Sequence, residues 1–307
     1  MKKLLSMILI ITLTLTTGAF AKIANSKTSV QSITKYPLKV VDGSKNTITI
    51  EKEPQRIISL SPTITESVFA IGKGNKLVGR TTYCDYPVAA KKVTAIGSIT
   101  NPSIEKIVEL KPDLVLASDL SNTEMLKKLE ELKVKVLYIK NEESFNGVFA
   151  TMKILGQVTN AMTGANRVIT SIKYRISTVA EKIKTSKKKP SVYYVVGFGK
   201  YGDYTATGDT FISNMITMAG GTNAAIDGSG WKYSLEKLIE KNPDIMICSK
   251  FYDTKKGILE TTGYKDLKAV KSGKLIEIDE NFISRQGPRI GEGLYKLAKI
   301  IHPELFK

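Results

Sequence analysis

The chain has 307 residues, of which 42% are hydrophobic and 24% are charged. This is the composition of a globular protein with one or two sizeable cores, and it excludes long disordered or low-complexity segments. The formal net charge of +17 could indicate nucleic acid, an anionic ligand or a membrane surface as a partner, but the lysines are spread along the chain, which favours a solvated lysine-rich surface, and the export pattern of residues 1–21 argues against nucleic acid.

Residues 1–21 have the pattern of a secretory signal peptide. A basic start, MKK, precedes an apolar run, and residues 19–21 (AFA) match the small-x-small site that signal peptidase cleaves. No cysteine stands at that junction, so we expect a free periplasmic or secreted protein without a lipid anchor. Beyond residue 21 no apolar run approaches the ~18 residues that a membrane span needs.

The next segment is an extension followed by the start of an α/β lobe. Residues 22–53 contain two alternating runs around Asp42 and Gly43, which predict a β-hairpin. A buried strand at Arg56–Leu60 then leads into a helix that begins at Ser61-Pro62. A strand that passes directly into a helix is typical of a parallel α/β sheet.

A second strand, Leu77–Arg80, leads into the loop at residues 81–87. In a parallel sheet such a loop lies at the carboxyl edge, where ligands bind. The first lobe is predicted to end with the strand Val134–Ile139, and we assign it residues 54–143.

A sixteen-residue unit occurs twice in the chain. SIEKIVELKPDLVLAS at Ser103–Ser118 and SLEKLIEKNPDIMICS at Ser234–Ser249 agree at seven positions. In each copy serine begins a helix, Pro-Asp ends it, and an apolar run follows as a buried strand. Two copies of one helix–strand unit predict two similar α/β lobes with a cleft between them, rather than a solenoid.

Residues 144–189 are predicted to form a stiff helical linker, and residues 190–307 the second lobe. Apolar residues recur at helical spacing as far as Lys184, with a break expected near Gly164. The second lobe repeats the strand–helix plan of the first. Its segment at residues 197–202 matches G-x-G-x-x-G, but the next helix begins only after Gly208, so nucleotide binding is disfavoured.

Catalytic residue sets are scarce in this sequence. His302 is the one histidine and lies near the C-terminus, which argues against a histidine-based hydrolase and against direct metal binding by several histidines. The two cysteines, Cys84 and Cys248, are too few for a disulfide framework and are expected to be free thiols. We therefore expect a binding protein without a cofactor or a directly bound metal, rather than an enzyme.

Two groups of residues are candidates for binding. Glu105 and Glu236 occupy matching positions in the two repeats, where they either complement the helix dipole or contact a two-fold symmetric partner. Aromatic and basic residues gather in the predicted carboxyl-edge loops and suit a large, partly apolar ligand with oxygen donors. These candidate ligand residues are Tyr83, Tyr86, Phe198, Tyr201, Tyr204, Trp231, Asn281, Phe282, Arg285 and Arg289.

The sequence resembles the cobalamin and ferric-chelate substrate-binding proteins of ABC importers. The resemblance rests on PQRIISLSPTITESVFAIG, TTYCDYP, the two repeats, GGTNAA and RQGPRIGEGLYKLAKIIHPELF, and it covers nearly all of residues 54–306. It implies two Rossmann-like lobes, each with a mostly parallel sheet flanked by helices, joined by one long rigid helix. The ligand would lie between the lobes of a monomer.

The resemblance also implies roles for single residues. Glu105 and Glu236 would contact arginines of a dimeric permease that works with an ATPase. Tyr83 and Trp231 match aromatic residues that touch the corrin in cobalamin-binding members, whereas Ile99 replaces a tryptophan of those members. Cobalamin is therefore ranked ahead of haem, and both ahead of a ferric siderophore. A secreted chelatase-like enzyme and a haem scavenger without a permease are the alternatives.

Overall fold

A computed structural model describes residues 33–307, so the predicted signal peptide lies outside the described part. The chain opens with the antiparallel hairpin of β1 (Leu38–Val41) and β2 (Thr47–Ile50), as predicted. Val40 and Ile50 bury their side chains in the core of the first lobe, which fixes the hairpin to it. Within the described residues no helix is long and apolar enough to cross a membrane.

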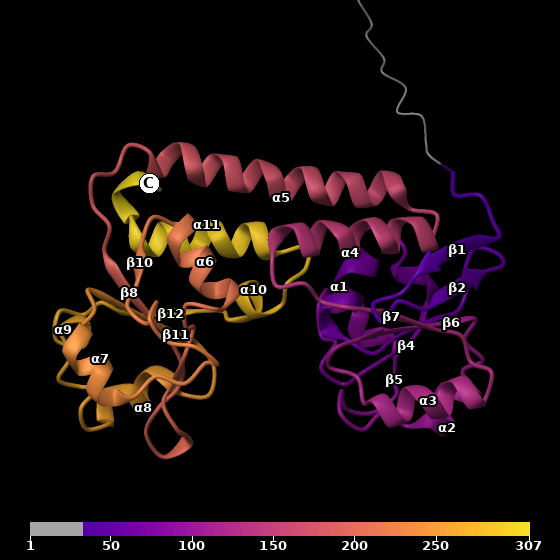
Figure 1. Ribbon diagram of the computed structural model, residues 1–307, viewed down its shortest axis with the longest axis horizontal. Coiled ribbons are helices and arrows are strands. Elements are labelled where there is room, and N and C mark those ends of the chain that lie inside the picture. Colours follow the sequence, from indigo (N-terminus) through magenta and orange to yellow (C-terminus); the bar gives the residue numbers. More distant parts are fainter. Residues whose placement is uncertain (1–32) are drawn as a thin grey trace, which may run out of the picture. The chain divides into compact units, whose positions relative to one another are not determined.

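The first lobe, called lobe 1, is built on a five-stranded parallel sheet (Figure 1). Its spatial order is β5-β4-β3-β6-β7, so the order reverses between β3 and β6 as in a doubly wound sheet. The strands are β3 (Ile57–Ser59), β4 (Leu77–Arg80), β5 (Thr94–Ala95), β6 (Leu114–Ser118) and β7 (Val136–Ile139). The helices are α1 (Pro62–Ala70), α2 (Ile104–Glu109) and α3 (Thr123–Glu131).

The second lobe, lobe 2, repeats this plan with the order β10-β8-β11-β12, all parallel. A short strand, β9 (Tyr204–Thr205), pairs antiparallel with β8. The parallel strands are β8 (Ser191–Gly197), β10 (Thr222–Asn223), β11 (Ile245–Ser249) and β12 (Leu275–Ile278). The helices are α6 (Phe211–Met218), α7 (Leu235–Lys241), α8 (Thr254–Glu260), α9 (Lys268–Lys271), α10 (Asn281–Ser284) and α11 (Ile290–Ile301).

The sequence repeat forms α2 with β6 in lobe 1 and α7 with β11 in lobe 2, as predicted. Its aspartate has the same structural role in both copies. Asp113 accepts hydrogen bonds from the backbone N–H groups of Gln55 and Arg56, directly before β3. Asp244 accepts hydrogen bonds from the backbone N–H and the hydroxyl of Ser191, at the start of β8. Each carboxylate therefore joins the end of a repeat helix to the first strand of its lobe.

The linker consists of α4 (Phe145–Val158) and α5 (Met162–Ile183). The predicted division into two helices is confirmed, with the break at residues 159–161, just before Gly164, which lies in the first turn of α5. A Cβ atom on Gly164 would stand 2.2 Å from the carbonyl oxygen of Ile71, so this glycine lets α5 approach the end of α1 closely.

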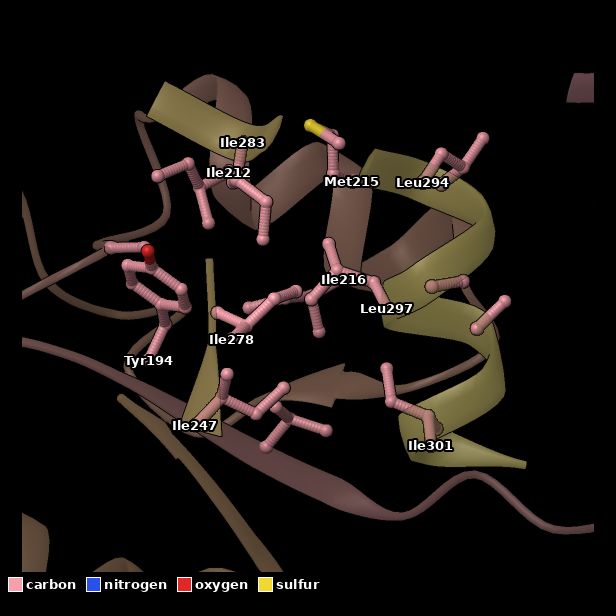
Figure 2. Close-up of a cluster of buried hydrophobic side chains, with 14 of the residues drawn as sticks. Tyr194, Ile212, Met215, Ile216, Ile247, Ile278, Ile283, Leu294, Leu297 and Ile301 are labelled. Carbon is pink, nitrogen blue, oxygen red and sulfur yellow. The ribbon is translucent and has the colours of Figure 1, made fainter. Parts of the chain in front are cut away.

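One long helix connects the two lobes, and it belongs to both hydrophobic cores. Ala165 and Ile169 of α5 are buried in the core of lobe 1, whereas Ile172 and Val179 are buried in that of lobe 2. In Figure 1, α5 lies along α4 and α11, and contacts with both helices are present. Figure 2 shows the second core, in which isoleucines of β11 and β12 meet side chains of α6 and α11.

Candidate ligand-binding site

A cavity of about 530 Å³ lies between the carboxyl edges of the two sheets. From lobe 1 its wall includes the residues that follow β3 and β6, the pair at which the strand order reverses. From lobe 2 it includes β8, α6 and the segment after β12. Ligands of α/β sheets bind at this kind of position, and the volume suits a small molecule. The lining residues are Ser61, Thr63, Ile64, Ser118, Asp119, Leu120, Ile139, Asn141, Glu143, Thr151, Tyr194, Val195, Val196, Phe211, Ile212, Trp231, Glu280, Ile283, Ser284 and Gln286.

Within the described part of the chain, Trp231 is one of three aromatic residues that lobe 2 contributes to the cavity wall, with Tyr194 and Phe211, and it lies in a tightly held turn. Its backbone has a positive φ of 69°, which is unfavourable for a residue other than glycine. The conformation is supported by hydrogen bonds from Trp231 N–H to the Thr207 hydroxyl (3.1 Å) and from Gly230 N–H to Asp209 (2.9 Å). Hydrogen bonds from Thr207 and from Gly230 also lower the pKa of Asp209. The surrounding polar groups thus fix the tryptophan in place.

The lobe 1 wall is held by Asp119, directly after β6. Its carboxylate accepts hydrogen bonds from the Tyr138 hydroxyl and from the backbone N–H of Asn141. The hydrogen bond to Asp119, together with burial, raises the pKa of Tyr138 to about 12, so this hydroxyl stays protonated at neutral pH. The neighbouring Ser118 is 7% exposed, and its hydroxyl has no hydrogen-bond partner among the described residues. A buried hydroxyl of this kind is available to a ligand.

The ionisable groups on the cavity wall are mainly acidic. Asp119, Glu143 and Glu280 line the cavity, whereas none of the lining residues, all within the described part, is a lysine, arginine or histidine. Such a wall disfavours ligand carboxylates and favours amide N–H donors or positive charge. Among residues 33–307 no cluster of three or more His, Cys, Asp or Glu side chains is placed to bind a metal.

The predicted ligand residues are distributed over several places. Trp231 lines the cavity, whereas Tyr83 and Tyr86 lie in the 81–87 loop and are 59% and 44% exposed. Phe198 packs on Tyr264 with ring centroids 6.0 Å apart, against the core of lobe 2. Tyr204 lies in β9, Asn281 and Phe282 lie in α10, and the side chain of Tyr201 is outside the described part.

Arg285 and Arg289 were predicted as ligand contacts, and the structure places them in ion pairs. Both guanidinium groups bind the carboxylate of Glu66 at 2.7–2.9 Å, and Arg285 also binds Asp85 at 2.7 Å. Neither arginine is among the residues that line the cavity. Their positive charge is therefore already balanced within the protein.

Comparison with known proteins identifies the family. The family described as "Periplasmic binding protein" matches residues 57–282, a span that includes the strands of both sheets. This chain belongs to the periplasmic binding protein family. An uncharacterized ABC transporter substrate-binding lipoprotein of Bacillus subtilis is 33% identical over 277 residues, which are 89% of this chain and 88% of the relative.

Two further relatives of this periplasmic binding protein carry ligand names. A cobalamin-binding protein of Halobacterium salinarum is 26% identical over 279 residues, covering 87% of this chain and 74% of its own. The apo structure of a periplasmic haem-binding protein from Roseiflexus sp. RS-1 superposes with a TM-score of 0.74 at 25% identity, covering 82% of this chain and 99% of its own. The fold predicted for the chain, with two α/β lobes and one connecting helix, is that of its structural neighbours.

The matching glutamates of the binding protein are both exposed. Glu105 lies in the first turn of α2 and Glu236 in that of α7. The serine before each helix caps it, since the Ser103 and Ser234 hydroxyls accept hydrogen bonds from backbone N–H groups at 3.2 and 3.4 Å. The backbone N–H of Ser103 donates to the carbonyl oxygen of Ile96, directly after β5, and that of Tyr233 donates to the carbonyl oxygen of Asp203, which follows β8. Both helices therefore begin at the carboxyl edge of their sheet, the edge that faces the cavity.

Sequence analysis missed several residues of this binding protein's site. Asp119 follows the repeat strand directly, so its position after a predicted strand was a usable signal. Glu143 and Glu280 also follow strands. For Glu66, inside a predicted helix, the sequence offered no sign that the carboxylate is 2% exposed and paired with arginines more than 200 residues away.

Proposed function

We propose that this periplasmic binding protein is the substrate-binding component of an ABC importer and that it captures its ligand in the cavity between the lobes. The observation that carries the proposal is the cavity itself, enclosed by the carboxyl edges of two doubly wound sheets in a chain of this family. The names of the relatives, which include an ABC transporter substrate-binding lipoprotein and a cobalamin-binding protein, support the same role.

The ligand is a corrinoid or a similar amide-bearing metal chelate. Corrin rings carry peripheral amides, whereas haem carries two carboxylates. Among residues 33–307, the cavity wall has three carboxylates, no basic side chain, and the Ser118 hydroxyl without a hydrogen-bond partner, so it suits amide groups better than carboxylates. Trp231 supplies a flat aromatic face for the ring. Haem is the second candidate, on the strength of its binding by a structural neighbour.

The protein binds its ligand without converting it. His302, the residue that a chelatase would need as a proton acceptor, is 1% exposed, and its Nε2 lies 3.1 Å from the carbonyl oxygen of Gly220. It is absent from the cavity wall. This placement supports binding over the chelatase-like alternative.

Delivery takes place at a dimeric permease that works with an ATPase. Glu105 and Glu236, exposed on equivalent helices of the two lobes, each pair with an arginine of one permease half. The protein acts as a monomer that is exported by its signal peptide; the Bacillus subtilis relative is called a lipoprotein. Mass spectrometry of the mature protein from cells would show whether residue 22 is the N-terminus and whether a lipid is attached.

A titration tests the ligand class. Trp231 is the one tryptophan of the chain and lines the cavity, so ligand binding should quench its fluorescence. Purified protein is titrated separately with cyanocobalamin, haemin and a ferric hydroxamate siderophore. We expect saturable one-to-one quenching by cyanocobalamin with weaker or no binding of the other two. Weak and equal quenching by all three would contradict a dedicated cavity, and tight binding of haemin alone would replace the corrinoid by haem.

A further inference from the structure

A buried charge cluster joins the two lobes beside the cavity. Glu66, on α1 of lobe 1, is 2% exposed. One of its carboxylate oxygens accepts a hydrogen bond from Arg289 Nε at 2.7 Å, and the other accepts from Arg289 Nη2 at 2.7 Å and from Arg285 Nη1 at 2.9 Å. Both arginines belong to the 285–289 loop of lobe 2, between α10 and α11. One carboxylate of lobe 1 therefore binds two guanidinium groups of lobe 2.

The same arginines contact the 81–87 loop of lobe 1. Arg285 donates hydrogen bonds to the Asp85 carboxylate at 2.7 Å and to the carbonyl oxygen of Tyr83 at 3.4 Å. The Arg289 guanidinium lies over the ring of Tyr86, 4.0 Å from its centroid. Burial is the largest single influence on Asp85 and opposes its ionisation, but the hydrogen bond with Arg285 and the positive charges of Arg285 and Lys91 together outweigh it and lower the pKa of the carboxyl group. We call Glu66, Asp85, Arg285 and Arg289 the interlobe clamp.

Neutral contacts continue from the interlobe clamp to the cavity wall. Gln286 accepts a hydrogen bond from the Asn141 side chain of lobe 1 at 3.2 Å, and both residues line the cavity. A Cβ atom on Gly287 would stand 3.2 Å from Cγ2 of Thr63, another lining residue on α1. The 285–289 loop thus touches the part of lobe 1 that forms the wall.

The clamp is balanced in charge, with two carboxylates against two guanidinium groups. Moving the lobes apart would break the bidentate pair of Arg289 with Glu66 and the hydrogen bonds from Arg285 to Glu66 and Asp85. This is unfavourable, because charge-assisted hydrogen bonds are strong and a bidentate pair has a demanding geometry. The clamp therefore resists a change in the distance between the lobes.

We propose that Glu66 is a positioning residue of the binding site. By binding Arg285 and Arg289 across the lobes, it fixes the width of the cavity and the place of the 81–87 loop, and so limits the size of ligand that the cavity accepts. The consequence for ligand choice rests on the proposed function, whereas the mechanical role of the clamp does not.

The mechanical role is tested by the distance between the lobes. Spin labels are placed in the full-length mature protein by Lys128→Cys on α3 and Lys256→Cys on α8, which are exposed, while the native cysteines are buried. We expect a single narrow distance distribution in this background, and a broader or shifted one after Glu66→Gln. The matched control is Glu53→Gln, since Glu53 pairs with Lys73 of lobe 1 and with Asn160 of the linker, and both contacts lie outside the interlobe clamp. If Glu66→Gln does not fold, the test is repeated with Asp85→Asn, at the half-exposed end of the clamp, and with Arg285→Lys, which keeps the charge.

Ligand dissociation tests the positioning role. We expect Glu66→Gln to release cyanocobalamin at least tenfold faster and to reduce the preference for cyanocobalamin over haemin, whereas Glu53→Gln leaves both unchanged. A purely structural role would lower the unfolding temperature without changing that preference, and this result would overturn the proposal. Unchanged distance distributions in the clamp variants would overturn it as well. If the unaltered protein binds neither cyanocobalamin nor haemin, the proposed function fails. The spin-label distances then still test whether the interlobe clamp fixes the distance between the lobes.

Discussion

The aspartate at the end of the second repeat makes a testable contribution to stability. A hydrogen bond from Lys268 and one from the backbone N–H of Ser191 lower the pKa of Asp244 from 3.8 to about 2. A shift of this size corresponds to about 2.5 kcal/mol if it acts in full. The Asp244 side chain is 36% exposed, so solvent screening reduces this value, and we expect about 1 kcal/mol.

The pH dependence of unfolding shows whether this reasoning holds. Because the pKa is lowered in the folded state, the contribution is present above pH 3.8 and is lost as the pH falls towards 2. Urea unfolding of the unaltered protein and of Asp244→Asn should therefore differ by about 1 kcal/mol at pH 7 and converge near pH 2. Asp266→Asn, which removes a 60% exposed carboxylate paired with Lys271, is the control and should change little. A difference that stays constant from pH 7 to pH 2 would refute the electrostatic account.

Three further changes test the site, the docking surface and the linker. Trp231→Ala should weaken cyanocobalamin binding by about 1–3 kcal/mol, measured by calorimetry, with Trp231→Phe in between; no loss would place the site elsewhere. Glu105→Ala combined with Glu236→Ala should leave the ligand dissociation constant within about threefold, while ligand uptake by cells falls sharply. Full uptake by this variant would show that both glutamates only complement the dipoles of their helices. Gly164→Ala should destabilise the protein by about 1–3 kcal/mol in thermal unfolding, because the new methyl group would meet the Ile71 carbonyl, whereas an unchanged midpoint would show that α5 can shift without cost.

Those parts of the fold that depend on local pattern were predictable from the sequence. The repeat units keep the apolar spacing of a helix and the continuous apolar run of a buried strand, and α2, β6, α7 and β11 formed where expected. The two helices of the linker were also predicted, and the break between them lies a few residues before Gly164. Gly164 is needed because the end of α1 approaches α5 closely at this position. Such a contact between distant segments cannot be predicted from the spacing of apolar residues.

The predicted ligand residues show a second limit of prediction from sequence, which concerns charge pairs between distant segments. Arg285 and Arg289 look like ligand contacts as long as their counter-ion is unknown, and that counter-ion, Glu66, stands on the other lobe. Trp231 was recognisable as a candidate because it lies in a predicted carboxyl-edge loop and matches an aromatic residue of the cobalamin-binding members, and it does line the cavity. Sequence patterns identify which side chains can bind a ligand, whereas charge pairing over long sequence distances decides which of them are free to do so.

The position of α5 in two cores at once has a consequence for how the chain folds. A fragment that ends after lobe 1 and α5 would expose Ile172 and Val179, and a fragment that begins at β8 would leave the side chains that normally pack on them uncovered. Neither half is therefore expected to be stable when expressed alone. The two lobes should melt in one cooperative transition, and a destabilising change in either lobe should lower the melting temperature of the whole protein.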